Sequence, residues 1–314
     1  MRRAAVLCLV LALAPACNDL LGIPAPSLID GGTGDDGGES DGQPDADPFA
    51  PVDGAPPDAD APPARPQHLL LTEVNATGVP GEFVEIFNPL PVEVDLRDYY
   101  LTDDPSYYLV PDYDRRMTTQ PLRNRDLIAR FPEGSALPPG GVIVIAAKED
   151  EFRGEFSVAP DYAVVPSATD HVAEPMEIIA HGGVPIEIVD SGEAIILFWW
   201  DGQSDLVTDV DIVLVGETKL EPGSDNALPL KTDLSVDGPD DNAMAETYLP
   251  DAVSMLAMAA RHSGTYRRIA REEEHEASSG GNGVGGHDET SEDTRVTWEQ
   301  VNNTPPSPGV IEFP

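Results

Sequence analysis

Residues 81–89 read GEFVEIFNP, and this stretch decides the fold that the sequence predicts. Within it, four large apolar side chains at 83, 84, 86 and 87 flank the carboxylate of Glu85. Such a run is typical of a short β-strand that is buried on both faces. Asn88 and Pro89 then end the strand, because asparagine favours turns and proline has no amide hydrogen to donate to a neighbouring strand. The stretch therefore predicts an inner strand followed by a turn.

Short runs of the same kind recur along the chain. They occupy residues 69–74, 91–96, 126–131, 142–147, 185–189, 194–200 and 206–215. Turn-forming dipeptides such as Gly140-Gly141 stand between them, and no amphipathic helical pattern intervenes. In the second run, Val92, Val94 and Leu96 alternate with acidic residues, so we expect these three on one buried face. The pattern predicts an all-β fold, either a sandwich or a barrel.

In their order, several of these segments resemble the core of the lamin tail domain. They are LTEVN at 71–75, the stretch at 81–89, LPPGG at 137–141, SGEAIIL at 191–197 and the closing TPPSPG at 304–309. The resemblance implies an immunoglobulin-like antiparallel β-sandwich over residues 67–314. Two stretches depart from the family pattern, so we expect long loop insertions at about 150–183 and 220–294. The residues of the shared motif are Glu73, Glu82, Phe83, Glu85, Asn88, Pro89, Gly140 and Gly141.

Two of these motif residues, Glu73 and Glu85, place a carboxylate within an expected strand. A carboxylate there costs stability unless backbone amides or a cation satisfy it. We expect both to accept structural hydrogen bonds, and a bound cation is the alternative.

The first 16 residues have the composition of an export signal. Two arginines precede an apolar stretch, residues 4–14, that is too short to cross a bilayer as a helix. Small residues then lead to Cys17, an arrangement that resembles the lipobox of bacterial lipoproteins, whose cysteine is diacylated. We therefore predict a lipoprotein signal peptide at 1–16 and a membrane anchor on Cys17. The alternative is an ordinary signal peptide cleaved after Ala16.

Residues 17–66 are expected to form a disordered tether between that anchor and the folded region. From 23 to 66 the chain holds ten Pro, seven Gly and ten acidic residues among 44. Such a segment buries too little apolar surface to offset the entropy of ordering it. Asn18 differs from the aspartate that commonly retains lipoproteins in the inner membrane, so we predict the outer membrane or cell surface. Without the anchor, the protein would be periplasmic or secreted.

Charge and cysteine content exclude several classes of function. Acidic residues outnumber basic ones by 57 to 18, which gives a formal net charge of −39. Because nucleic acids are bound chiefly through Lys and Arg, no nucleic acid partner is expected. Both cysteines, Cys8 and Cys17, precede the folded region, which excludes a cysteine nucleophile, a zinc ribbon or a disulfide there.

Two acidic segments offer candidate metal ligands. The candidates are Asp237, Asp240, Asp241 and Asn242 in the first segment, and His287, Asp288 and Glu289 in the second. The oxygen-rich first segment suits Ca²⁺ but lacks the spacing of an EF-hand loop. The second joins a glycine-rich run to ligand types found in metal sites. Either could instead be a solvated loop whose polar side chains hydrogen-bond one another, so the sequence requires no cofactor and allows Ca²⁺.

No hydrolase, phosphate-binding or dinucleotide-binding motif occurs in the sequence. We therefore predict a noncatalytic binding or scaffolding lipoprotein that contacts extracellular or periplasmic proteins or glycans. The alternative is a metal-dependent hydrolase or nuclease-associated protein that uses the acidic segments at 237–242 and 287–289.

Overall fold

The computed structural model describes the folded part of the chain with gaps. The described residues are 68–76, 81–113, 115–116, 122, 125–183, 187–188, 192–216, 230–232, 234–239, 244–252, 264–301, 305–311 and 313. The expected signal peptide, Cys17 and the tether lie outside them. Within the described ranges, no helix is long and apolar enough to span a bilayer.

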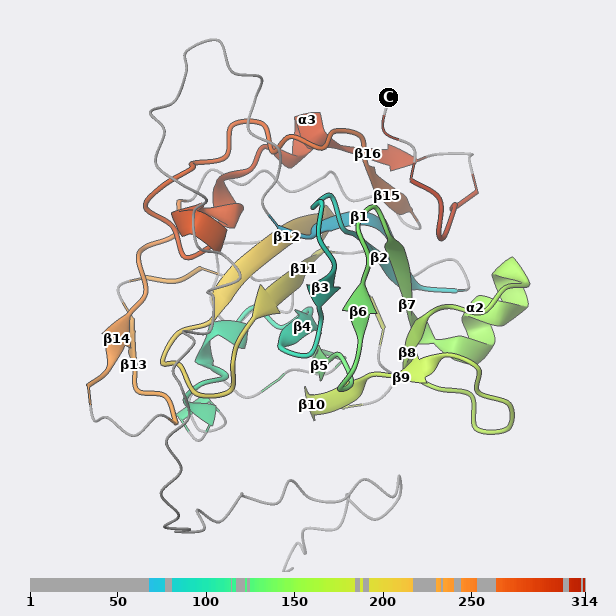
Figure 1. The fold of residues 1–314 in the computed structure, drawn as a ribbon, viewed down its shortest axis with the longest axis horizontal. Helices are drawn as coiled ribbons and strands as arrows, with labels where there is room; N and C mark the ends of the chain where they lie inside the picture. Colours follow the sequence, from blue (N-terminus) through green and yellow to red (C-terminus); the bar gives the residue numbers. More distant parts are fainter. Residues whose placement is uncertain are drawn as a thin grey trace, which may run out of the picture. The chain divides into compact units, whose positions relative to one another are not determined.

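The first layer is a seven-stranded sheet in the order β16-β15-β1-β2-β7-β8-β9. Its strands are β1 (Leu70–Asn75), β2 (Phe83–Phe87), β7 (Val142–Lys148), β8 (Tyr162–Val165), β9 (Glu174–Pro175), β15 (Thr265–Arg268) and β16 (Trp298–Val301). β1 pairs with β2 on one side and with β15 on the other. Segments from the two ends of the described chain therefore lie side by side, as the blue and red strands of Figure 1 show.

The second layer is a five-stranded sheet in the order β10-β5-β4-β11-β12. Its strands are β4 (Tyr99–Thr102), β5 (Leu127–Arg130), β10 (Glu177–His181), β11 (Gly192–Trp199) and β12 (Thr208–Gly216). Two small sheets pair β3 (Val94–Asp95) with β6 (Ala136–Leu137) and β13 (Ser235–Val236) with β14 (Glu246–Thr247). The helical elements are α2 (Glu149–Phe156), α3 (Thr294–Thr297) and the 3-10 turns η2 (Tyr107–Leu109), η3 (Val284–Gly286) and η4 (Glu289–Ser291).

The main core lies between the two sheets. Because successive strand residues point to opposite faces, Val84 and Ile86 of β2 face inward together. They share one buried cluster with Leu101 of β4 and Leu197 of β11. The same alternation sends Phe83 outward, where it packs against α2. The predicted all-β sandwich is confirmed.

The five-stranded sheet is also covered on its outer face. Phe198 of β11 stacks on Tyr100 of β4, with ring centroids 4.9 Å apart. Residues of η2, β13 and the segment around Tyr248 complete a second buried cluster there. Part of the expected insertion at 220–294 therefore packs against the outer face of this sheet.

One edge of the seven-stranded sheet differs from the antiparallel expectation. β8 pairs in parallel with β7, and β9 pairs in parallel with β8. A parallel neighbour needs a crossover connection, and α2 supplies it between β7 and β8. Phe152 and Phe156 of this helix pack edge-on against Phe83, each at 5.6 Å between ring centroids. The stretch expected as a loop insertion at 150–183 thus contributes α2, β8, β9 and β10.

Two smaller strand expectations also fail. In the run at 185–189, the described residues 187 and 188 belong to no strand. In the run at 91–96, only Val94 and Asp95 form a strand, and Val92 is 58% exposed. Because β3 pairs only with the two-residue β6, this part of the chain has no wide sheet to bury its apolar face against.

Candidate functional site

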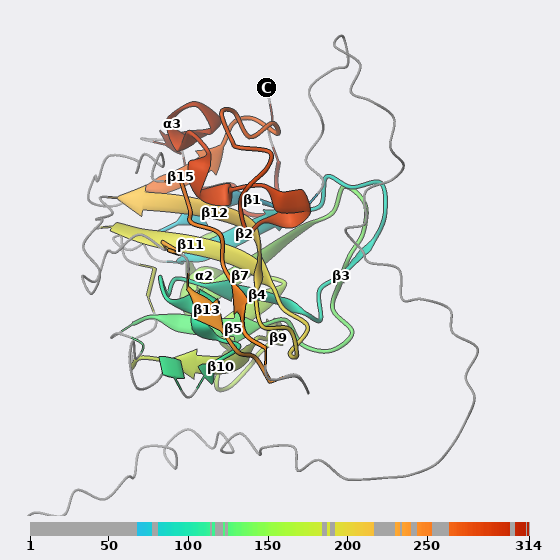
Figure 2. The ribbon, with the colours of Figure 1, turned by 90° about the vertical axis from the view of Figure 1, so that its left-hand side faces the viewer.

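Buried charges gather along β12, the edge strand of the five-stranded sheet. Asp209 and Asp211 of this strand are at most 1% exposed. Turns η3 and η4 cover the edge, as the red segment beside β12 in Figure 2 shows. A covered edge cannot recruit another strand, but the carboxylates buried with it need partners.

Lys231 is the partner of Asp209. Its Nζ lies 2.6 Å from Asp209 Oδ2 and donates to the hydroxyl of Tyr107 at 2.8 Å. Asp251 lies 3.7 Å from the same nitrogen. Burial lowers the pKa of Lys231, but the carboxylates of Asp209 and Asp251 raise it by more than burial lowers it. The net pKa is therefore above its usual value, and the ammonium stays charged. We name Lys231, Asp209, Asp251 and Tyr107 the Lys231 cluster.

Arg268, from the end of β15, is the partner of Asp211. Its Nη2 lies 2.7 and 2.9 Å from the two carboxylate oxygens of Asp211, and its Nη1 donates to Glu292 at 3.0 Å. Its Nε donates to the carbonyl of Leu71 in β1 at 2.8 Å. The guanidinium therefore links β15 and β1 of the seven-stranded sheet to β12 of the five-stranded sheet. We name Arg268, Asp211 and Glu292 the Arg268 cluster.

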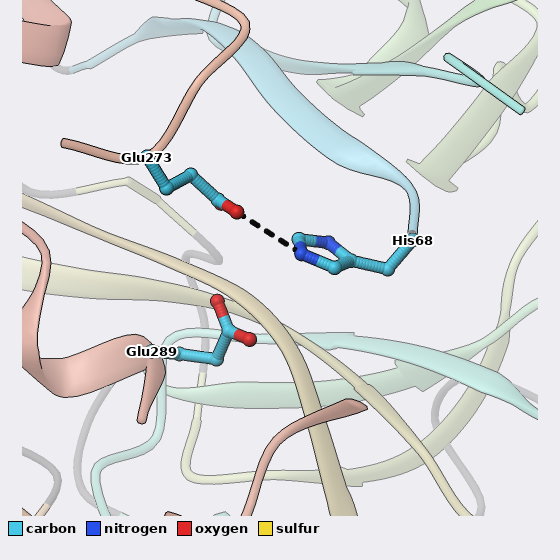
Figure 3. Close-up of side chains that lie close together, drawn as sticks. All are labelled: His68, Glu273 and Glu289. Carbon is cyan, nitrogen blue, oxygen red and sulfur yellow. Dashed lines mark ion pairs between the residues drawn. The ribbon is translucent and has the colours of Figure 1, made fainter. Parts of the chain in front are cut away.

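A third group, the His68 cluster, comprises His68, Glu273, Glu276, His287 and Glu289. His68 precedes β1, the two glutamates at 273 and 276 follow β15, and Glu289 begins η4. Nε2 of His68 lies 3.1 Å from Oε2 of Glu273, and Glu289 points toward the same place (Figure 3). Glu276 pairs with Nδ1 of His287 at 3.0 Å. Two imidazoles and three carboxylates thus meet where three distant segments come together.

Burial perturbs the protonation of this cluster strongly. Burial lowers the pKa of His68, but the carboxylates of Glu273 and Asp211 outweigh it and raise that pKa to about 9. Burial and the charges of Glu273 and Glu276 raise the pKa of Glu289 well above its usual range. The hydrogen bond that His287 donates to the carboxylate of Glu276 raises the pKa of His287. Perturbations of this size mark either a structural ion network or a functional site.

The glycine-rich run explains how Glu289 reaches this position. A Cβ on Gly281 would lie 2.1 Å from the carbonyl oxygen of His287, and one on Gly283 would lie 2.7 Å from Oε1 of Glu289. Only glycine permits such close approach, so the run folds back against the residues that follow it. Its amides at 281 and 283 donate to the carbonyls of Gly286 and His287.

The structure separates the residues that the sequence proposed as metal ligands. His287 and Glu289 belong to the His68 cluster, whereas Asp288 accepts hydrogen bonds from the amides of Ala252 and Thr290. Asp237 is exposed. Asp240, Asp241 and Asn242 lie outside the described residues.

His68, Glu273 and Glu276 were missed by the sequence analysis. Their spacing follows no metal-binding motif, because the three segments meet only after β1 and β15 pair. The available signal was compositional: the sequence EEEHE at 272–276 holds carboxylates and a histidine together.

The residues of the strand motif have structural contacts. Asn88 is fully buried, and its Nδ2 donates to the carbonyls of Val92 and Leu137 at 2.9 and 2.8 Å. Its backbone exchanges hydrogen bonds with the Gly140-Gly141 turn, so Asn88 holds the ends of β2 and β7 together. Pro89 follows it in the turn that ends β2.

The motif glutamates bind backbone amides. Glu73 accepts from the amide of Ser307 at 3.1 Å and lies 3.5 Å from Arg267. Glu85 accepts from Thr72 and from the amide of Gly309, both at 2.7 Å. Glu82 accepts from the amide of Ile188 at 3.0 Å. Two of these three carboxylates therefore attach the segment at 305–311 to the seven-stranded sheet.

Two surface hollows lie away from the His68 cluster. One, of about 540 Å³, is lined by α2 and the loop that contains Ser167 and Asp170. The other, of about 400 Å³, lies between Trp199, Thr247 and Asn282. Neither is lined by a histidine or by a member of the three clusters.

The comparisons with known proteins include one distant structural likeness. The chain matches no model of a known protein family and no curated protein. The crystal structure of a DUF4876 family protein from Bacteroides thetaiotaomicron VPI-5482 is similar to it at 14% sequence identity. The likeness covers 74% of this chain and 70% of that chain, with a TM-score of 0.39. At this TM-score it adds nothing to the fold described above.

Proposed function

We propose that this protein is a noncatalytic binding or scaffolding module of the cell envelope. In this proposal, lipidated Cys17 anchors the chain, residues 18–66 act as a spacer, and the β-sandwich contacts extracellular or periplasmic proteins or glycans. The anchor would hold the protein at the outer membrane or cell surface. A diacylated cysteine suffices for stable attachment, because each buried methylene contributes roughly 0.8 kcal/mol.

One observation carries the noncatalytic part of the proposal. The buried charged side chains of the Lys231 and Arg268 clusters join backbone segments to one another and line neither surface hollow. A catalytic group has to reach its substrate, and these groups are closed off by their own hydrogen bonds. These buried charges stabilise the fold, which is consistent with a domain that binds its partners through its surface.

We also propose that the sandwich is of the lamin tail type. The supporting observation is the set of contacts made by the shared motif. Asn88 and the Gly140-Gly141 turn bridge β2 and β7, and Glu73 and Glu85 hold the closing segment at 305–311. These contacts give four of the five quoted segments a structural role, which supports the resemblance.

A metal-dependent hydrolase is the second candidate, and the His68 cluster is what favours it. Two imidazoles with three carboxylates resemble the ligand types of catalytic metal sites. Against it, His68 and Glu289 are at most 2% exposed, which leaves a substrate little access to an ion between them.

The anchor is tested by replacing Cys17 with serine in the full chain and separating membrane from soluble protein. Cys8→Ser is the matched control, because it removes the only other thiol. We expect labelled palmitate and membrane attachment to be lost in Cys17→Ser and retained in Cys8→Ser. Unchanged membrane attachment of Cys17→Ser would contradict the anchor.

The noncatalytic role is tested with ester and phosphodiester substrates in the presence of Ca²⁺, Mg²⁺, Mn²⁺ or Zn²⁺. We expect no turnover above that of the metal alone. Turnover that Glu289→Gln abolishes and Asp237→Asn leaves intact would instead establish the hydrolase.

A further inference from the structure

Glu289 is a buried carboxylate for which the described residues provide no hydrogen-bond donor. It is 2% exposed, and its Oε1 has no partner. Oε1 of Glu276 in the same place also has no hydrogen bond, whereas Nε2 of His68 and Oε1 of Glu273 have ion-pair partners, Glu273 at 3.1 Å and Arg268 at 3.7 Å. Buried polar atoms are nearly always satisfied, so the two carboxylate oxygens of Glu276 and Glu289 call for a missing partner.

The missing partner has to be positive. Among the described residues, Glu273 faces His68 at 3.1 Å and the guanidinium of Arg268 at 3.7 Å, Glu276 faces His287, and no cationic side chain forms an ion pair with Glu289. That guanidinium already binds Asp211 and Glu292 at 3.0 Å or less. A further carboxylate buried beside Glu273 and Glu276 is therefore left without compensation, which costs far more than burying a paired charge.

His68 is oriented as a metal ligand. Its Nδ1 lies 2.9 Å from the carbonyl oxygen of Leu69. A carbonyl oxygen only accepts, so Nδ1 carries a proton, and Nε2, which faces Glu273 (Figure 3), is the atom that an ion would bind after displacing the proton shared with Glu273. A backbone carbonyl that fixes the tautomer in this way is the usual support of a metal-binding histidine.

The distances suit one ion. The ligand atoms of His68, Glu273 and Glu289 lie within 4.8 Å of one another, and so do those of Glu276, His287 and Glu289. Metal–ligand bonds of about 2.1 Å place ligand atoms roughly 3.4 to 4.2 Å apart. Small side-chain movements would bring the ligand atoms of His68, Glu273 and Glu289 to bonding distance of one ion. Glu276 and His287 would then lie next to that ion.

A neighbouring carboxylate set serves as a contrast. Asp211, Glu273 and Glu292 also lie within 4.8 Å of one another. Arg268 already donates to Asp211 and Glu292, so the chain itself provides the cation there. Glu289 differs, because no arginine or lysine among the described residues lies within ion-pair distance of its carboxylate.

We propose that His68, Glu273 and Glu289 bind a divalent transition-metal ion, with Zn²⁺ as the first choice. Glu276 and His287 complete or flank the coordination, and the side chain of His287, 30% exposed, marks the side from which the ion enters. Mixed imidazole and carboxylate ligands favour Zn²⁺ or Mn²⁺, whereas Ca²⁺ takes six to eight oxygens. The ion would fasten the start of β1 to η4, and it is independent of what the module binds.

The test measures Zn²⁺ and Mn²⁺ binding by calorimetry after removal of metals with a chelator. The full chain is used with both cysteines replaced by serine, so that no thiol binds Zn²⁺. We expect one equivalent to bind and the melting temperature to rise by about 5 to 10 °C at 100-fold excess over Kd.

Two variants locate the ion. Glu289→Gln should weaken binding at least tenfold, because it removes a charged ligand without changing the shape of the side chain. Asp237→Asn, in the exposed acidic segment, should change the affinity less than twofold. Loss of binding in Asp237→Asn with retention in Glu289→Gln would overturn the assignment, as would the absence of saturable binding of either ion below 100 µM, a level about a hundredfold above a micromolar Kd.

A spectroscopic measurement makes the test independent of variant folding. X-ray absorption of the Zn²⁺-loaded protein should reveal at least one imidazole nitrogen at about 2.0 Å together with carboxylate oxygens. A shell of oxygens alone would contradict a site that includes His68. If two protons, and not a metal ion, neutralise the carboxylates of the His68 cluster, neither Zn²⁺ nor Mn²⁺ binds. The calorimetry therefore distinguishes protonation from metal binding.

Discussion

The Arg268 cluster and the His68 cluster contain the same kinds of buried carboxylate, yet they are neutralised differently. Asp211 and Glu292 face a guanidinium 2.7 to 3.0 Å away, donated by the same chain. Glu289, three residues before Glu292, faces other carboxylates and an imidazole. The comparison teaches that burial alone does not identify a site. What distinguishes the two is whether the fold supplies the opposite charge.

The largest effect is expected where the supplied charge is removed. Arg268→Met keeps the aliphatic stem but leaves Asp211 and Glu292 buried without a cation. We expect a loss of about 3 to 5 kcal/mol in the free energy of unfolding, measured with denaturant at pH 7. Arg97→Ala is the control, because its exposed pairs with Asp95 and Asp98 should contribute no more than about 0.5 kcal/mol. Equal effects of the two would remove the distinction between the clusters and the surface.

The Lys231 cluster provides the same comparison with a second cation. Lys231→Met should lower the free energy of unfolding by about 2 to 4 kcal/mol, because Asp209 and Asp251 lose their ammonium. The loss is smaller than for Arg268 because the hydroxyl of Tyr107 still donates to Asp209. Adding Asp209→Asn should recover part of the loss in denaturant unfolding. A double variant that is weaker than Lys231→Met would contradict the pairing.

Two neighbouring glutamates sharpen the contrast through the sign of their effects. In metal-free protein, Glu289→Gln should raise the free energy of unfolding by about 1 to 2 kcal/mol at pH 8, since it removes an uncompensated buried charge. Glu292→Gln should lower it by about 1 kcal/mol, since it weakens the bond from Arg268. Both are measured by denaturant unfolding with a chelator present. The same sign for both would break the comparison.

Glu82 tests the effect of burial outside the clusters. Burial raises its pKa to about 7, against which the amide of Ile188 and the charge of Lys148 act only in part. Between about pH 4.5 and 7, Glu82 is protonated in the folded protein but ionised in the unfolded chain. The free energy of unfolding therefore falls as the pH rises through this window, and above pH 7 the folded protein holds a buried carboxylate. Glu82→Gln keeps an acceptor for Ile188. We expect it to be about 1 kcal/mol more stable than the natural protein at pH 8 and nearly equal at pH 5, in melts at both values.

The sequence predicts the strands whose pattern is local. β2, β7, β11 and β12 are apolar runs bounded by turns, and each forms where expected. β15 and β16 were not expected, since TYRR and WEQV alternate weakly. They are strands because β15 pairs with the edge of β1, and β16 then pairs with β15. α2 was missed because EDEFRGEF is mostly polar, and its two phenylalanines become meaningful only once Phe83 is beside them.

The candidate site was half predictable. His287 and Glu289 stand close together in a segment of metal-ligand composition, so sequence reasoning found them. His68 precedes the first strand, far from its partners along the chain, and it reaches them only through the pairing of β1 with β15. The same reasoning overvalued Asp288, whose carboxylate is occupied by backbone amides that no spacing rule reveals.

The position of β1 between β2 and β15 sets an order of events during synthesis. Leu71 and Arg268, which bond directly, are separated by 197 residues. A growing chain can pair β1 with β2 early, but the other edge of β1 stays unpaired until β15 has been synthesised. A product that stops before residue 265 would therefore keep an open hydrogen-bonding edge and would tend to join another copy through it. Pairing with β15 closes this edge of β1 within the same molecule.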